Sequence, residues 1–418
     1  MYESDLITPK IRALAEETEA ALAARFAAFD AVARDNTERV LTAFREHHIS
    51  DSQFGGTSGY GYDDPGREAL EKVYAQVFGA EAALVRLMFV NGTHAITAAL
   101  FACLRPGDTL LAATGAPYDT LRGVIGTSGE VFGSLKMYGV DYAQVELAAG
   151  GGPDFAAIAA AVREKKPACV LVQRSRGYAK RRALSPAEIG EIAAVVKEAG
   201  PDTAVVVDNC YGEFCDRTEP CHHGVDLMAG SLIKNPGGGL APTGGYIAGR
   251  AELVERAAYR MTAPGIGGEC GATLGQNRLL IQGFFLAPHT VAQALKTAAL
   301  CAGMLEKLGR GTSPASDAAR QDIIQMVELG SAERLVAFCQ GIQKGSPVDA
   351  FVRPEPWRMP GYDCEVVMAA GTFVQGSSIE LSCDGPLREP YLAYLQGGLT
   401  YEAGRFGVMA ALSEMLDK

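Results

Sequence analysis

The feature that most constrains this chain is a pair of charged residues placed beside two short apolar segments. Residues 204–208 read AVVVD, and residues 227–234 read LMAGSLIK before a glycine-rich NPGGG sequence. Apolar runs of this length between turn signals predict buried strands. Burying a carboxylate or an amine without a partner costs on the order of several kcal/mol. We therefore expect Asp208 and Lys234 to be functional residues, although a satisfied strand-end aspartate and a surface lysine in a turn would give the same pattern.

Pyridoxal phosphate is the cofactor that needs an amine and a carboxylate in such a place. A lysine binds it covalently, and a carboxylate pairs with the nitrogen of its ring, which lets the ring accept electrons from the substrate. Lys234 and Asp208 match these two roles. The glycines after Lys234 would let the backbone approach a flat ring closely. Desolvation and nearby cations are expected to lower the pKa of Lys234 below that of an ordinary lysine.

A turn between a predicted strand and a helix offers a site for the phosphate. Residues 83–90 form a strand candidate, followed by Asn-Gly-Thr-His and the apolar sequence AITAALFACL. Backbone N–H groups and the helix dipole at such a turn attract anions. We expect Gly92 and Thr93 to contact the phosphate, with Ser231 as a further hydroxyl, although an ordinary capped helix would read the same way.

Two other predicted strands also end in polar or aromatic residues. The segment 109–113 leads to Tyr118, which could stack on the ring of the cofactor, and the segment 168–173 ends at Gln173. Open α/β sheets place ligands at the carboxyl ends of their strands, which favours both residues as cofactor contacts. Ordinary loop packing would explain Tyr118 equally well.

The loop 54–67 and several arginines complete the set of candidates. The loop is rich in glycine, tyrosine and aspartate, and Tyr60 and Tyr62 are candidate cofactor contacts, although turn formation alone explains this composition. A planar guanidinium suits the carboxylate of an amino-acid substrate. The candidates for that role are Arg388, Arg174 and Arg176.

The order of predicted elements indicates an α/β protein in three parts. Residues 1–50 form a helical arm with a restart near Asn36, residues 51–285 a large domain with a mainly parallel sheet, and residues 286–418 a smaller α+β domain. Further predicted elements are a helix from 274 to 308 with an expected break near Pro288, another helix at 398–416, and strands at 132–138, 364–370 and 377–382.

Composition and missing motifs exclude several classes of protein. A net charge of −11 argues against nucleic acid as an obligatory partner. Ten cysteines without a CxxC pair, and no visible signal peptide or apolar run long enough to cross a membrane, favour a reduced, cytoplasmic protein. The cluster of Cys215, Cys221, His222 and His223 fits no zinc spacing, so we expect no metal. Sequence motifs of serine hydrolases, zinc proteases and mononucleotide- or dinucleotide-binding proteins are absent.

Seven phrases resemble one family of fold-type I pyridoxal-phosphate enzymes, the aluminium resistance protein or methionine γ-lyase-like family. They are SGYGYDDPGRE, NGTHAI, TGAPYDTL, VVVDNCYGEF, AGSLIKNPGGGLAPTGGYIAG, APGIGGECG and GSSIELSCDGPLREPY. The resemblance implies a large domain with a seven-stranded sheet. It also implies that Lys234 binds the cofactor covalently, that Asp208 pairs with the ring nitrogen, and that Tyr118 stacks on the ring.

The same resemblance implies an obligate homo-oligomer, a dimer or tetramer, with sites at the subunit interface. In better-known relatives an aromatic and an arginine from the neighbouring subunit complete the phosphate site. Here the matching loop contains Tyr60 and Tyr62 but no arginine in a Tyr-x-Arg arrangement.

The function implied is that of a carbon–sulfur lyase acting on a methionine-, cystathionine- or cysteine-like amino acid by β- or γ-elimination. One alternative keeps the cofactor and changes the reaction to aldol cleavage or transamination of a small amino acid. A second alternative is a non-catalytic protein that binds a metal or the cofactor.

Overall fold

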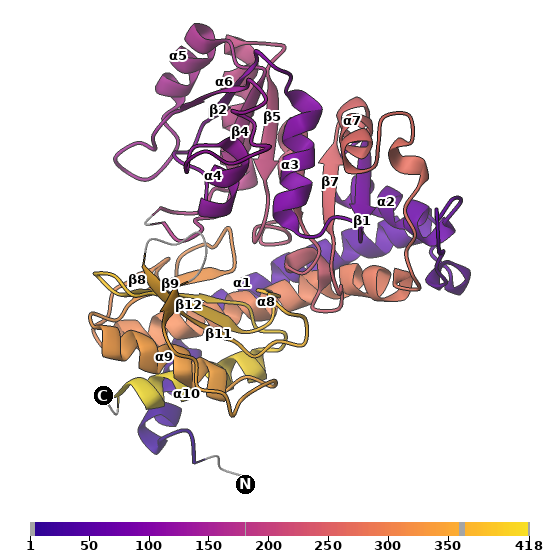
Figure 1. Cartoon of the computed structure of the whole chain (residues 1–418). Helices are drawn as coiled ribbons and strands as arrows, with labels where there is room; N and C mark the ends of the chain where they lie inside the picture. The colour runs from indigo at the N-terminus through magenta and orange to yellow at the C-terminus, as the bar shows by residue number, and fades with distance from the viewer. Residues whose placement is uncertain (1–4, 180, 359–363, 417–418) are drawn as a thin grey trace. The chain divides into compact units, whose positions relative to one another are not determined.

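The computed structural model describes residues 5–179, 181–358 and 364–416, and these fall into two compact units. The large unit is Asn36–Phe285, and the small unit combines Met1–Asp35 with Leu286–Lys418. Two long helices, α1 (Pro9–Glu46) and α8 (Asn277–Lys307), contribute residues to both units (Figure 1).

Helix α1 is continuous, so the predicted restart near Asn36 is wrong. Asparagine often starts a helix because its side chain caps free backbone N–H groups. Here the Asn36 amide instead donates hydrogen bonds to the carbonyl oxygens of Phe214 and Asp216, and its oxygen accepts one from Arg39. Contacts with a distant segment therefore use the side chain that could have capped a second helix.

The large unit is built on a seven-stranded sheet. Strand β7 is antiparallel to both of its neighbours, and the other adjacent pairs are parallel. Every residue of the parallel strands β4, β5 and β6 is buried, as expected for strands covered on both faces, and the antiparallel strand β7 is buried as well. The spatial order is β1 (Ala82–Arg86), β7 (Gly245–Gly249), β6 (Leu227–Ser231), β5 (Ala204–Asp208), β4 (Cys169–Gln173), β2 (Thr109–Ala112) and β3 (Asp141–Gln144). This sheet confirms the predicted α/β class.

Helices of the large unit begin where the sequence supplies capping residues. Ser185 and Glu188 form a capping box at the start of α6, and the Asp154 side chain caps α5. The helices are α2 (Pro65–Phe78), α3 (Gly92–Cys103), α4 (Asp119–Ile125), α5 (Phe155–Lys165), α6 (Pro186–Ala199) and α7 (Ala251–Met261), with short 3₁₀ turns at Asp51–Phe54, Pro220–His223, Asn235–Gly237 and Gly267–Glu269.

The predicted strand at 132–138 is wrong, because this segment forms turns and the strand follows it as β3. Gly133 and Gly139 have positive φ angles of 80° and 79°, which interrupt extended structure. The backbone N–H of Leu135 donates to Val124 at the end of α4. The segment therefore packs its backbone on a helix instead of pairing in the sheet.

The small unit contains a six-stranded antiparallel sheet. Its order is β10 (Trp357–Arg358), β11 (Glu365–Ala370), β12 (Ser382–Pro386), β13 (Leu392–Gln396), β9 (Ile324–Glu328) and β8 (Thr312–Ser313). Helices α9 (Ala332–Lys344) and α10 (Tyr401–Leu416) pack with this sheet in one apolar core that includes Phe338, Leu395 and Leu412.

Two predictions for this region need correction. Of the predicted strand at 377–382, only Ser382 belongs to a strand, β12, and the residues before it form turns. Helix α8 continues through Pro288, so the chain does not break there. No helix within the described ranges is long and apolar enough to cross a membrane.

A buried carboxylate, Asp64, connects the 54–67 loop to the start of α8. Its oxygens accept hydrogen bonds from the Arg67 backbone at 3.0 Å, the Thr57 hydroxyl at 2.6 Å, the Asn277 amide at 2.9 Å and the Thr273 hydroxyl. Burial alone would raise the pKa of Asp64, but these hydrogen bonds lower it to about 2. The ionised carboxylate is thus the form that stabilises the loop.

Replacing this carboxylate should destabilise the chain. We expect Asp64→Asn to lose about 2–3 kcal/mol of unfolding free energy at pH 7, because a neutral amide cannot accept all four hydrogen bonds. The exposed neighbour Asp63 is a matched control, and Asp63→Asn should change stability by less than about 0.5 kcal/mol. Urea denaturation measures both variants.

The pH dependence of this effect has a defined sign. A carboxylate whose folded pKa is depressed stabilises the protein above its unfolded pKa of about 3.9. The difference between Asp64→Asn and the parent chain should therefore shrink as pH falls from about 4 towards 2. Equal stability of the two proteins at pH 7 would contradict the role given to Asp64.

Candidate cofactor site

Lys234 follows β6 and lies at the start of a short 3₁₀ turn, Asn235–Gly237. Its amine lies 3.8 Å from the centre of the Tyr211 ring. Within the described ranges the amine has no hydrogen bond and no ion pair. An ammonium over an aromatic face is stabilised only modestly. The Tyr211 ring therefore contacts the amine, and no described residue forms a hydrogen bond or an ion pair with it.

Asp208 ends the neighbouring strand β5 and is 4% exposed. One of its carboxylate oxygens accepts a hydrogen bond from the Cys210 backbone at 3.1 Å. Burial raises the pKa of Asp208, while the positive charge of Lys234 acts in the opposite direction. The two residues thus influence each other electrostatically, although no ion pair joins them in the described part of the chain. A ligand that presents a positive group to Asp208 and a negative group to Lys234 would gain from both charges.

The expected lowering of the Lys234 pKa is wrong for the chain without a bound ligand. Burial does lower that pKa, but Cys210, Tyr211, Asp208 and Tyr118 together raise it above the value of an ordinary lysine. From the sequence we expected desolvation and nearby cations to lower this pKa, whereas the groups that surround the amine are acids. The amine is therefore cationic until a ligand or substrate changes its surroundings.

The three phosphate candidates come together at the start of α3. Asn91 caps this helix by accepting from the His94 backbone at 2.9 Å, and Gly92 is its first residue. A Cβ atom on Gly92 would lie 3.1 Å from the Cβ of Ser231. Thr93 is hydrogen-bonded through its hydroxyl to the phenol of Tyr118 at 2.8 Å. Gly92, Thr93 and Ser231 therefore gather at one helix N-terminus, which suits an anion.

Gln173 positions the segment that carries Tyr118. Its side-chain oxygen accepts a hydrogen bond from the Tyr118 backbone at 3.0 Å, and its amide donates to the Ser175 carbonyl at 3.0 Å. The side chain of Gln173 is 7% exposed. Both ends of the amide are thus occupied by the chain itself, and a direct contact of Gln173 with the cofactor stays a prediction.

The remaining candidates lie apart from this cluster or already have partners. Tyr60 and Tyr62 are exposed, with stacked rings whose centres are 5.7 Å apart. Arg174 is fully buried and forms an ion pair with Glu219 at 2.7 Å. Arg176 is buried in the large unit, and Arg388 is exposed in the small unit.

Three residues near Asp208 were not identified from the sequence. Tyr211 has a positive φ of 72°, an uncommon conformation that is often found at functional sites. Cys210 and Arg181 act on the charge of Asp208, and the Arg181 guanidinium is held by the carbonyl oxygens of Thr114 and Ser175. The aromatic residue three positions after Asp208 was a usable signal, whereas nothing local to the sequence indicates Arg181.

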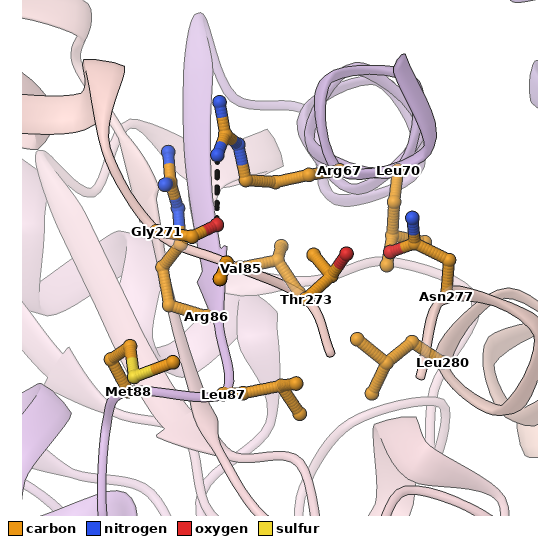
Figure 2. Close-up of a pocket in the computed structure, with 11 residues that line it drawn as sticks. Arg67, Leu70, Val85, Arg86, Leu87, Met88, Gly271, Thr273, Asn277 and Leu280 are labelled. Atoms are coloured by element: carbon orange, nitrogen blue, oxygen red, sulfur yellow. Dashed lines mark hydrogen bonds between the residues drawn. The ribbon is translucent and has the colours of Figure 1, made fainter. Parts of the chain in front are cut away.

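A small hollow beside β1 is separate from these residues (Figure 2). It has room for about one water molecule, and Arg67, Arg86, Thr273 and Asn277 supply its polar lining. Figure 2 shows the hydrogen bond from Arg67 to the carbonyl of Gly271, at 2.8 Å. The hollow contains none of the predicted cofactor ligands, so it is not the cofactor site.

The groups gathered at the sheet edge fit pyridoxal phosphate. Asp208 is a buried acid without an ion-pair partner in the described residues, Lys234 is an amine without one, and a helix N-terminus with two hydroxyls lies beside them. These are the groups needed by the ring nitrogen, the aldehyde and the phosphate of this cofactor.

Comparison with known proteins agrees with this chemistry. The family model for methionine gamma-lyase matches residues 11–416. The uncharacterized protein YnbB of Bacillus subtilis (strain 168) is 51% identical over 98% of this chain and 97% of its own length. The crystal structure of a carbon-sulfur lyase involved in aluminum resistance from Clostridium novyi NT has 49% identity and a TM-score of 0.94, covering 98% of this chain and 96% of that one.

A more distant structure supports the fold alone. The pyridoxal-5′-phosphate-dependent protein YhfS of Escherichia coli has 21% identity and a TM-score of 0.63, covering 92% of this chain and 96% of that one. Together with the match over nearly the whole sequence, these findings confirm the predicted fold, cofactor and enzyme class. The chain belongs to the methionine gamma-lyase family of pyridoxal-phosphate-dependent carbon–sulfur lyases.

Proposed function

We propose that this enzyme cleaves a carbon–sulfur bond at the β or γ carbon of a sulfur-containing amino acid, such as cystathionine, methionine or cysteine. The observation that carries the proposal is an amine without an ion pair, Lys234, beside a buried acid, Asp208, at the ends of adjacent strands in a member of this family. The similarity to a protein named carbon-sulfur lyase supports the choice of bond.

The chain's own residues would divide the work as follows. Pyridoxal phosphate, when bound, supplies an electron-accepting ring that stabilises negative charge at the α carbon of an amino acid. Lys234 would hold the cofactor and, after the substrate amine displaces it, would carry a proton to or from the substrate. Asp208 would pair with the ring nitrogen, and Gly92, Thr93 and Ser231 would bind the phosphate.

Tyr118 is suited to donate a proton to a departing thiolate. Burial and then the charge of Asp208 raise the pKa of Tyr118, so its phenol stays protonated. Two hydrogen bonds fix the position of Tyr118. One joins its phenol to the Thr93 hydroxyl, and the other runs from its backbone N–H to the Gln173 side chain. Stacking of the Tyr118 ring on the cofactor, as the family resemblance implies, is part of the same proposal.

The substrate carboxylate and the oligomer are finer points of the proposal. Arg388, which is exposed, and Arg176 remain candidates for binding the carboxylate, whereas the ion pair of Arg174 with Glu219 disfavours Arg174. The exposed, stacked pair of Tyr60 and Tyr62 would contact the cofactor of a neighbouring subunit in a dimer or homotetramer. We place the enzyme in the cytoplasm, because its ten cysteines are all free.

Product analysis tests the reaction. Incubation with cystathionine, methionine or cysteine should release an oxo acid, pyruvate or 2-oxobutyrate, together with ammonia and a thiol. Threonine should serve as the comparison substrate, because aldol cleavage would convert it to glycine, and a transaminase would require an oxo-acid acceptor. Glycine formation, or turnover only with an added acceptor, would contradict carbon–sulfur elimination.

Removal of the proposed anchor should abolish turnover. Lys234→Ala should bind pyridoxal phosphate only reversibly and lose steady-state lyase activity, because no amine remains to hold the cofactor or carry the proton. Borohydride reduction followed by peptide mapping should label Lys234 in the parent chain. The exposed Lys72 on α2 is the matched control, and Lys72→Ala should keep both the label and the activity. A label on another lysine would overturn the assignment.

A further inference from the structure

A group of polar side chains is buried behind the predicted cofactor residues. All five of its members are at most 1% exposed, and the phenol among them comes from β7. We call this group the buried polar network, and its members are Arg174, Asn209, Glu213, Glu219 and Tyr246. None of these residues has a role in the reaction proposed above.

The network holds the residue that follows Asp208. The Asn209 amide donates hydrogen bonds to the Tyr246 phenol at 3.1 Å and to Glu219 at 3.2 Å. Its oxygen accepts one from Arg174 at 2.8 Å. Every polar group of the Asn209 side chain is thus fixed by the network, and the turn that carries Asp208 is fixed with it.

The same network reaches the residue that follows Lys234. The Asn235 side-chain amide donates to the backbone carbonyl of Glu213 at 2.9 Å, and Asn235 is fully buried. Glu213 therefore lies between the two turns, bonded through its backbone to Asn235 and through its side chain to Tyr246, which contacts Asn209.

Charge is balanced in this network only if Glu213 is neutral. Arg174 and Glu219 form a close ion pair, and the second oxygen of Glu219 accepts from the Phe214 backbone at 2.7 Å. One carboxyl oxygen of Glu213 accepts a hydrogen bond from the Tyr246 phenol at 2.9 Å. The other carboxyl oxygen of Glu213 has no hydrogen-bond partner among the described residues. An ionised Glu213 would be a buried charge without a hydrogen-bonded cation, which is strongly unfavourable.

We propose that Glu213 is a positioning residue that is a neutral carboxylic acid in the folded enzyme, and that its ionisation in alkaline solution disturbs the turns carrying Asp208 and Lys234 and weakens cofactor binding. The cofactor part of this inference rests on the proposed function. The neutral state of Glu213 is a property of the folded chain alone.

The groups that face Glu213 are consistent with this state. Burial and then the charge of Glu219 raise the pKa of Glu213 to about 8, while its own backbone N–H, the Tyr246 hydrogen bond and Arg174 act in the opposite direction. Tyr74 on α2 and Cys210 also face its charge, and burial keeps both of them protonated by raising the pKa of each well above its ordinary value. Among the described residues that act on the pKa of Glu213, Arg174 is the cation that favours its ionised form.

The space around the carboxyl group leaves little room for rearrangement. A Cβ atom on Gly230 of β6 would lie 2.6 Å from a carboxyl oxygen of Glu213 and 2.6 Å from the Tyr246 ring. The acid and the phenol thus pack directly on the backbone of the strand that leads to Lys234. A new charge here could gain solvation only by moving this strand or the Asp208 turn.

The first test measures the stability of the full chain without added cofactor, in the parent and in Glu213→Gln, between pH 5 and 9. The folded parent holds a proton that the unfolded chain releases above pH about 4.3. Its folding equilibrium constant should therefore fall about tenfold per pH unit relative to Glu213→Gln, up to a pH of about 8. A constant ratio across this range would show that Glu213 is ionised and overturn the proposal.

The second test measures the dissociation constant of pyridoxal phosphate in the same pair of proteins. The ratio of the parent value to the Glu213→Gln value should rise above pH about 8, by at most tenfold per pH unit for one linked proton. Glu380→Gln is the matched control. This second buried glutamate lies in the small unit, where it accepts from the Phe373 and Val374 backbones, and its replacement should leave the ratio unchanged.

The two tests separate the possible failures. A pH-dependent stability ratio with a constant affinity ratio would overturn the positioning role of Glu213. A chain that binds no pyridoxal phosphate at any pH would overturn the proposed function, and the stability ratio would still decide the protonation of Glu213. An infrared band of a protonated carboxylic acid that disappears in Glu213→Gln would support the neutral state directly.

Discussion

The structure depends on two opposite charges that are kept near each other without forming an ion pair. Asp208 and Lys234 end or follow adjacent parallel strands, so the sheet fixes their separation. A buried pair in direct contact would largely satisfy itself, whereas this arrangement leaves each charge incompletely compensated by the other. The free energy lost there is offset by the apolar core of the sheet, and binding of a ligand with complementary charges recovers part of it.

Such an arrangement needs support from residues behind it. The hydrogen bonds of Asn209 and Asn235 tie the two turns to one buried network, and the Arg174–Glu219 ion pair lies inside that network. Removing one member would leave its partner buried without a hydrogen bond, which costs about 1–3 kcal/mol. The sequence VVVDNCYGEF therefore encodes more than the proposed partner of the ring nitrogen, since its asparagine is hydrogen-bonded to the buried network next to that acid.

The sequence predicted elements whose signals are local. Apolar runs predicted the central strands, and the charged residues beside two of these runs pointed to Asp208 and Lys234. Predictions failed where distant contacts decide the outcome. Asn36 bonds to a segment almost 180 residues away, and so α1 does not restart there. The acids around the Lys234 amine also come from separate segments, which is why the predicted direction of its pKa shift was wrong.

The arginines also show that contacts between distant segments cannot be predicted from local sequence. Their contacts reduce the number of candidates for binding the substrate carboxylate. A guanidinium next to a strand end reads as a substrate ligand, but Arg174 is fully buried and its charge is matched by Glu219, more than 40 residues away. Arg181, which no motif singled out, acts instead on the charge of Asp208. A buried arginine whose charge is already matched by a carboxylate gains little from binding a second carboxylate. Arg174 is therefore a poor candidate for binding the substrate carboxylate.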